Sequence, residues 1–312
     1  MRFILIFIIS TVLGYVAGFR PFGIGRDFLN YSYFYALVDF NDISFFRFEP
    51  GFVISAKIAK TVFEFDYMTF AFVLMTVSLC LKFFVLSSLK NYIPAFAFYI
   101  ACWFPLQENT QVRLAVATSI IFLATKYLFQ NRWKTFLALS AIAATFHITI
   151  VVCAAVIFTA HFLGRYKVLY SLAICVVPAL VIPYLIDLIF PIFVQINLTL
   201  GGIEPGSEDI NIFSLTNIFA TLFLIASVLS GSVNSHSNRV FFLVSCAGFA
   251  CLIGFMSIPI VAHRLKDMML VYMTFIAFEY RMSTKTLPQA IIATLLAAGS
   301  LYANINLGLF SD

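Results

Sequence analysis

Long apolar segments separated by short polar breaks run through almost the whole sequence. They lie at about residues 3–19, 68–87, 92–105, 114–129, 135–147, 148–163, 168–186, 213–231, 239–258, 264–281 and 287–307. A helix satisfies its own backbone hydrogen bonds in lipid, and most of these runs are too long for the alternating strands of a membrane barrel. The pattern therefore predicts an all-α membrane protein with about ten or eleven transmembrane helices.

Two segments near the amino terminus depart from the simple pattern. The first apolar segment, 3–19, follows Arg2 and has no A-x-A-like cleavage site, so it is predicted to be a transmembrane helix, not a signal peptide. In the stretch 50–65, Lys57 and Lys60 belong to a polar stripe at helical spacing. A stripe of this kind is typical of an interfacial or re-entrant helix.

The positive charges between the segments predict the orientation. Basic residues that flank spans face the cytoplasm, and here they are Arg2, the run 126–134, Arg165 with Lys167, and Arg281 with Lys285. The opposite, outer face then collects segment 20–67, the break 107–113, the turn near His147, the loop 187–212 and the helix entry at His263. This assignment makes 135–163 a short helical hairpin and leaves the carboxyl terminus outside.

Composition excludes a soluble protein. Hydrophobic residues make up 62% of the 312 and charged residues 11%, against about 45–50% and about 25% in soluble domains. The net charge of +5 is accounted for by basic span flanks, so nucleic acid is not an implied partner. The six cysteines lie in apolar segments without metal-ligand spacing, so no metal or cofactor is predicted. No repeat divides the chain, and 1–312 is predicted to be a single domain.

Charged residues beside a span must be paired, hydrated or functional, which directs attention to the outer face. Asp27, Asn30 and Tyr31 would share one face if their stretch is helical. Glu49 precedes Pro50, which is suited to open a helix. Both carboxylates also have structural explanations, because Asp27 is able to cap a helix and Glu49 to sit favourably at a helix amino end.

An arginine stands at the start of the apolar segment that follows the polar break 107–113. There Arg113 opposes the helix dipole, at a place where an anion would be favoured. An anionic ligand explains this position better than a structural role does. Gln107 and Gln111, in the same break, are further candidates for binding that ligand.

Three more candidates come later in the chain. His147 has no ionisable neighbour in sequence, so it is either a packing residue or, from its outer position, a base. Arg264 and Lys266 lie at the predicted start of segment 264–281. Two arginines at helix amino ends on the same face, Arg113 and Arg264, would suit the oxygens of a diphosphate.

The order of these short motifs resembles a known family. The chain resembles the EpsG-like branch of the Wzy polysaccharide polymerases over about residues 20–270. The motifs that carry this resemblance are, in order, GRDFLNY, RFEPGF, QVRLAVATSIIFLA, TFHITI and HRLKDMM. The resemblance implies a GT-C-like glycosyltransferase of the bacterial inner membrane. Such an enzyme moves a glycan from undecaprenyl diphosphate onto another lipid-linked repeat unit on the periplasmic face, in contact with membrane lipids and with a chain-length regulator as a possible partner.

The same resemblance assigns roles to individual residues. Arg113 and Arg264 would hold the donor diphosphate, and His147, Glu49 or Asp27 would accept the proton of the attacking hydroxyl, with inversion at the anomeric carbon. The remaining substrate-binding candidates are Lys266, Gln107, Gln111, Asn30 and Tyr31. No metal is expected to be needed.

Two other classes of function fit the composition. A flippase for lipid-linked sugars would also carry intramembrane charges, although no inverted repeat is present. A membrane sugar acyltransferase would use His147 as the base for acyl transfer. The two differ from a polymerase in that neither lengthens the glycan.

Overall fold

The computed structural model describes most of the chain. The described residues are 2–19, 28–38, 48–166, 172–173, 176–177, 180–181, 210–256, 258–279 and 284–306. Within these ranges the backbone forms helices and turns, and no strand occurs. The predicted all-α fold is confirmed.

The chain forms two compact units. Unit 1 comprises Met1–Val151, Phe278–Arg281 and Ala293–Asp312, and unit 2 comprises Val152–Ala277 and Met282–Ile292. Unit 1 contains α1 (Arg2–Gly18), α2 (Phe28–Leu37), α3 (Pro50–Thr61), α4 (Tyr67–Leu86), α5 (Tyr92–Cys102), α6 (Phe104–Gln107), α7 (Val112–Phe129) and α8 (Trp133–Ala144). Unit 2 contains α12 (Leu215–Leu229), η2 (Ser232–Asn234), α13 (His236–Gly254) and α14 (Pro259–Leu270). It also contains most of α9 (Ile150–Leu163) and of α15 (Met273–Phe278). The α16 helix (Leu287–Asn306) has residues in both units.

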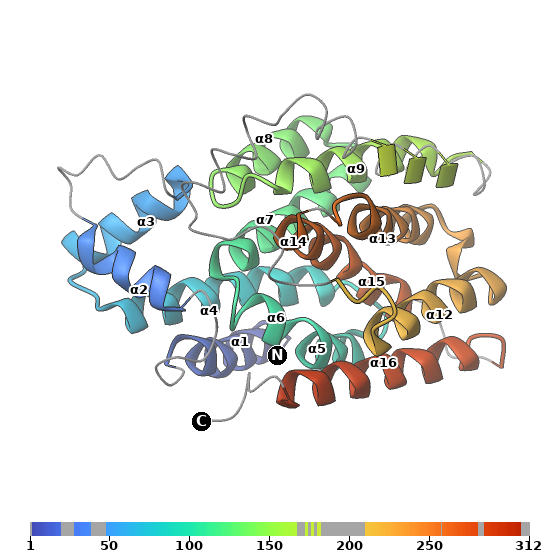
Figure 1. Cartoon of the computed structure of the whole chain (residues 1–312), viewed down its shortest axis with the longest axis horizontal. Helices are drawn as coiled ribbons and strands as arrows, with labels where there is room; N and C mark the ends of the chain where they lie inside the picture. The colour runs from blue at the N-terminus through green and yellow to red at the C-terminus, as the bar shows by residue number, and fades with distance from the viewer. Residues whose placement is uncertain are drawn as a thin grey trace. The chain divides into compact units, whose positions relative to one another are not determined.

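In unit 1, α1 lies along α4, as Figure 1 shows. The close approach depends on Gly14 and Gly18, which are one helical turn apart on α1. A Cβ atom on Gly18 would lie 2.5 Å from the Cα of Phe72, so only glycine fits there. Small residues at this spacing let the backbones of membrane helices come together. The α4 helix in turn contacts α7, and α7 contacts α8, so α7 has a neighbour on each side.

Aromatic side chains join α2 to the start of α3. Tyr31 and Phe34 are buried on α2, and both rings contact Phe52 of α3, at 5.5 and 5.8 Å between centroids. The ammonium group of Lys60 donates hydrogen bonds to the carbonyls of Ala36 and Val38, at 2.7 and 3.2 Å. Lys60 therefore holds the carboxyl end of α2, so part of the predicted polar stripe of α3 faces protein. The interfacial location of α3 stays a prediction.

In unit 2, α13 packs against α14, and Gly248 makes this contact close. A Cβ atom there would lie 2.9 Å from the Cβ of Met269. Elsewhere in this unit Phe241, Tyr272 and Phe275 stack on one another, with the rings of Phe241 and Phe275 4.7 Å apart. The close helix contact and the stacked rings both contribute to the core of this unit.

Four of the described helices are long and apolar enough to cross a membrane. They are Tyr67–Leu86, Val112–Phe129, His236–Gly254 and Leu287–Ile305, and five shorter apolar helices accompany them. The chain is thus a polytopic membrane protein, as predicted. The count of ten or eleven spans and their orientation stay predictions, because segment 168–186 falls largely, and loop 187–212 mostly, outside the described residues.

The segment predicted as one span at 264–281 is instead two helices. Pro259 opens α14 five residues before Arg264, and α14 ends at Leu270. The backbone then tightens into i to i−3 hydrogen bonds, such as the 3.2 Å bond from Thr274 N to the carbonyl of Val271. The prediction that Arg264 heads a helix amino end is therefore wrong, because the proline starts the helix more than one turn earlier.

Candidate active site

Glu49 joins two of the predicted site residues in unit 1. Its Oε1 atom lies 3.1 Å from Nδ1 of His147 and accepts a 3.3 Å hydrogen bond from the backbone N–H of Ile148. Its other oxygen, Oε2, forms an ion pair with Nη1 of Arg113. The side chains of Glu49 and Arg113 are each 15% exposed, and that of His147 is 5% exposed. The three groups thus form one partly enclosed cluster from distant parts of the sequence.

Aromatic rings hold the guanidinium of Arg113. Its Nε donates a 3.3 Å hydrogen bond to the hydroxyl of Tyr31, and its Cζ lies 4.7 Å from the ring centre of Phe48 and 5.5 Å from that of Tyr31. Cation–π contacts of this kind fix a guanidinium without neutralising it. Arg113 is the second residue of α7, so its predicted place at a helix amino end is confirmed.

The local sequence explains why Glu49 reaches His147. Pro50 opens α3, and Glu49 before it is extended and does not cap the helix with its side chain. The N–H of Gly51 donates a 2.7 Å hydrogen bond to the carbonyl of Thr145, two residues before His147. A Cβ atom on Gly51 would lie 2.8 Å from that carbonyl oxygen. Glycine at 51 is therefore required for the close approach that brings the two side chains together.

We expect Gly51→Ala to lower activity strongly with a smaller loss of stability. The added methyl group pushes the start of α3 away from Thr145 and so separates Glu49 from His147. A misplacement of about 1 Å near a reacting group costs on the order of 10²-fold in rate. The measurement is the activity of the purified variant relative to wild type, and Ile54→Val, at an exposed position of the same helix, is the matched control. Unchanged activity of Gly51→Ala would contradict the role given to this contact.

The carboxylate of Glu49 stays ionised in its surroundings. Burial alone would raise its pKa, but the hydrogen bond with His147 and the charge of Arg113 outweigh burial and lower the pKa to about 2. An ionised carboxylate only accepts hydrogen bonds, so Nδ1 of His147 must carry the proton between them. In the neutral ring Nε2 is then the basic nitrogen. Glu49 is therefore placed to orient the imidazole of His147, and which of the candidate residues acts as the base stays a prediction.

Of the other candidates in unit 1, Tyr31 joins the cluster and Asn30 does not. Asn30 is exposed whereas Tyr31 is buried. The two neighbours thus differ in exposure, since successive helical residues point about 100° apart, and the face shared with Asp27 stays a prediction. Asp27 lies outside the described residues. Gln111 directly precedes α7, and its buried Oε1 has no hydrogen-bond partner among the described residues.

The candidates in unit 2 lie on α14. Lys266 is 3.4 Å from the carboxylate of Asp267 and 3.5 Å from Oδ1 of Asn217. Arg264 is half-buried in the second turn of the helix. Because Arg264 and Arg113 belong to different units, their joint binding of a diphosphate stays a prediction.

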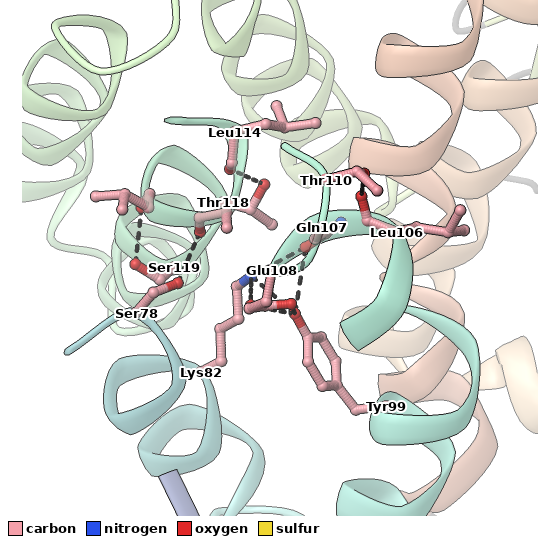
Figure 2. Close-up of polar contacts among 12 residues, drawn as sticks. Ser78, Lys82, Tyr99, Leu106, Gln107, Glu108, Thr110, Leu114, Thr118 and Ser119 are labelled. Carbon is pink, nitrogen blue, oxygen red and sulfur yellow. Dashed lines mark hydrogen bonds and ion pairs between the residues drawn. The ribbon is translucent and has the colours of Figure 1, made fainter. Parts of the chain in front are cut away.

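A buried ion pair in unit 1 was missed by the sequence reasoning. Lys82 and Glu108 lie 2.6 Å apart with side chains that are 0% exposed, and Gln107 also binds Lys82, as Figure 2 shows. Gln107 is thus a partner of Lys82, whereas the sequence analysis proposed it only as a substrate-binding residue. A lysine inside the apolar run of α4 could have indicated this ion pair, since a charge within a span needs a partner.

Metal ligands do not gather in the described part of the chain. No group of three His, Cys, Asp or Glu side chains suited to a metal ion occurs there. Five cysteines are free thiols, namely Cys80, Cys102, Cys153, Cys246 and Cys251. That the activity needs no metal ion stays a prediction.

Comparison with known proteins places the whole chain in one family. No curated protein and no solved structure matches it. The model of the EpsG family matches residues 3–304, nearly the full length, and this match indicates a polysaccharide-polymerase-like function of the glycosyltransferase type. On the strength of that coverage, the chain belongs to the EpsG family.

Proposed function

We propose that this protein is a membrane polysaccharide polymerase that transfers a glycan from undecaprenyl diphosphate to a sugar hydroxyl of a second lipid-linked repeat unit. The observation that carries the proposal is the cluster in which Glu49 contacts both His147 and Arg113. It combines an oriented base with a fixed cation, the two groups that a displacement at an anomeric carbon requires.

His147 is the catalytic base in this proposal. Nε2 takes the proton of the acceptor hydroxyl, the hydroxyl oxygen forms a bond to the anomeric carbon, and the bond from that carbon to the diphosphate oxygen breaks. The electron pair leaves with undecaprenyl diphosphate. A single displacement of this kind inverts the anomeric carbon. Glu49 holds Nδ1–H and stabilises the imidazolium that forms.

Arg113 stabilises the charge that develops on the leaving diphosphate. One of its donors is used by Glu49 and another by Tyr31, and the planar guanidinium has five N–H groups in all. Glu49 neutralises the single charge of Arg113, so the cluster alone does not balance a diphosphate. The additional positive charge expected from Arg264 and Lys266 stays a prediction, because both belong to the other unit and Lys266 already pairs with Asp267. The reaction is proposed for the periplasmic face of the bacterial inner membrane.

Reconstitution of the purified protein with a lipid-diphosphate oligosaccharide tests the proposal directly. We expect glycans of two, three and more repeat units, measured by mass spectrometry, and His147→Ala should lower their rate of formation by about 10²-fold or more. His236→Ala, a half-buried histidine of unit 2, is the matched control and should retain the rate.

Other outcomes would point to a different function. Movement of single repeat units across the bilayer without longer products would identify a flippase and overturn the proposal. Transfer of an acyl group at constant glycan length would identify an acyltransferase and also overturn it.

A further inference from the structure

Four polar side chains in unit 1 form a fully buried group, drawn in Figure 2. Lys82 of α4 donates hydrogen bonds to the hydroxyl of Tyr99 at 2.7 Å, to Oε1 of Gln107 at 2.9 Å and to Oε1 of Glu108 at 2.6 Å. All four residues are 0% exposed. We call Lys82, Tyr99, Gln107 and Glu108 the buried polar group.

The charges within the buried polar group satisfy one another. An ammonium group has three N–H donors, and Lys82 uses all three. Glu108 accepts from Lys82 and also from the hydroxyl of Tyr99, at 2.9 Å to one oxygen and 3.0 Å to the other. A buried charge with a complete set of partners is not arranged to bind substrate. Its effect on the site must pass through the backbone that carries it.

That backbone leads directly to Arg113. The N–H of Gln111 donates to the carbonyl of Gln107, and the N–H of Ala115 donates to the carbonyl of Gln111, both at 2.9 Å. Hydrogen bonds thus connect the short turn of α6 to the first turn of α7 across the break. Arg113 lies within this connected stretch, so a displacement at Glu108 is transmitted to it.

The α4 helix also holds the chain just after Arg113. Ser78, one helical turn before Lys82, donates a 3.0 Å buried hydrogen bond to the carbonyl of Ala115. Figure 2 shows Ser78 and Lys82 on the same helix, each with its partner. One face of α4 therefore fixes the backbone on both sides of Arg113, at Glu108 before it and at Ala115 after it.

We propose that Lys82 and Glu108 are positioning residues that set the place of the Arg113 guanidinium for the donor diphosphate. The proposal rests on the function proposed above for Arg113. Breaking a buried ion pair leaves an uncompensated charge, which the protein relieves by moving the segment or by admitting water. Either response shifts the start of α7, where Arg113 has its aromatic and carboxylate partners.

The test measures the affinity of purified protein in nanodiscs for undecaprenyl diphosphate. We expect Glu108→Gln to weaken binding by about tenfold in the wild-type background and by less than about twofold in the Arg113→Ala background, because the two residues act through one contact. A general loss of structure would weaken binding equally in both backgrounds. Ser119→Ala, which removes a buried hydrogen bond within α7, is the matched control and should bind as wild type does.

The outcomes separate the two proposals. If Arg113→Ala binds as wild type does, the function assigned to Arg113 is wrong. If Arg113→Ala binds weakly while Glu108→Gln binds normally, only the positioning role is overturned. The positioning role is also overturned if Glu108→Gln weakens binding equally in both backgrounds.

A second variant covers the case in which Glu108→Gln does not accumulate. Tyr99→Phe keeps the ion pair and removes one hydroxyl that bridges it. Binding that is about threefold weaker and depends on Arg113 supports the proposal. Unchanged binding overturns it.

Discussion

Arg113→Ala should reduce polymer formation by about 10²- to 10³-fold while the amount of protein in the membrane stays the same. The guanidinium is the only group of the cluster with a permanent positive charge, and the leaving diphosphate gains negative charge as its bond to the sugar breaks. The loss should therefore appear in kcat at saturating donor as well as in kcat/KM. Reconstituted enzyme with lipid-linked repeat units gives both quantities.

Two further variants define what Arg113 contributes. Arg113→Lys should keep part of the binding and little of the rate, since an ammonium lacks the planar pair of donors and the aromatic stacking. Full activity of Arg113→Lys would exclude bidentate binding of the diphosphate. Arg165→Ala, an exposed arginine in unit 2, is the matched control and should form polymer at the wild-type rate.

Glu49→Gln should lower the rate by about 10³-fold or more, although the side chain keeps its size. The amide is able to donate to Nδ1 of His147, which would move the ring proton to Nε2 and remove the base. The same change leaves Arg113 without its carboxylate partner. Glu49→Asp keeps the charge and should lose less activity. A Glu49→Gln enzyme with wild-type kcat would rule out the orienting role.

The pH dependence of stability gives a separate measurement on Glu49. Its pKa is about 2 in the folded protein against an ordinary value of 4.5, so the ionised form stabilises the fold at pH values above 4.5. That stabilisation is lost as the pH falls from 4.5 toward 2. The stability difference between wild type and Glu49→Gln should therefore shrink as the pH falls from 4.5 toward 2. A difference that stays constant down to pH 2 would contradict the lowered pKa of Glu49.

The sequence was sufficient to predict most of the described helices and part of the candidate site. Apolar length alone identified α1, α4 and α7 to within a few residues, because a span must be long and apolar. Grouping the charges by membrane face put Glu49, Arg113 and His147 in one set, which the structure brings into contact. Sorting residues by membrane face does not reveal which side chains touch. The sequence therefore left His147, Glu49 and Asp27 as candidate bases.

The remaining errors have local causes. Arg264 was misplaced because Pro259 starts α14 directly after the preceding apolar segment, five residues before Arg264. The Lys82–Glu108 pair was missed because 26 residues separate Lys82 on α4 from Glu108 at the end of α6, and no local period connects them. Contacts between helices of a membrane protein depend on which faces meet, and hydropathy carries little of that information.

Burial of Lys82 also constrains the order in which this protein is made. Glu108 follows Lys82 by 26 residues, so α4 leaves the ribosome ahead of the segment that carries the partner of Lys82. A lysine at the centre of a span costs about 2.5 to 3.5 kcal/mol on insertion scales. Lys82 is the one charged residue among the 20 of α4, and it lies near the helix's end, where its long stem is able to reach the interface. Pairing with Glu108 thus belongs to a later stage of assembly, after α7 has arrived beside α4.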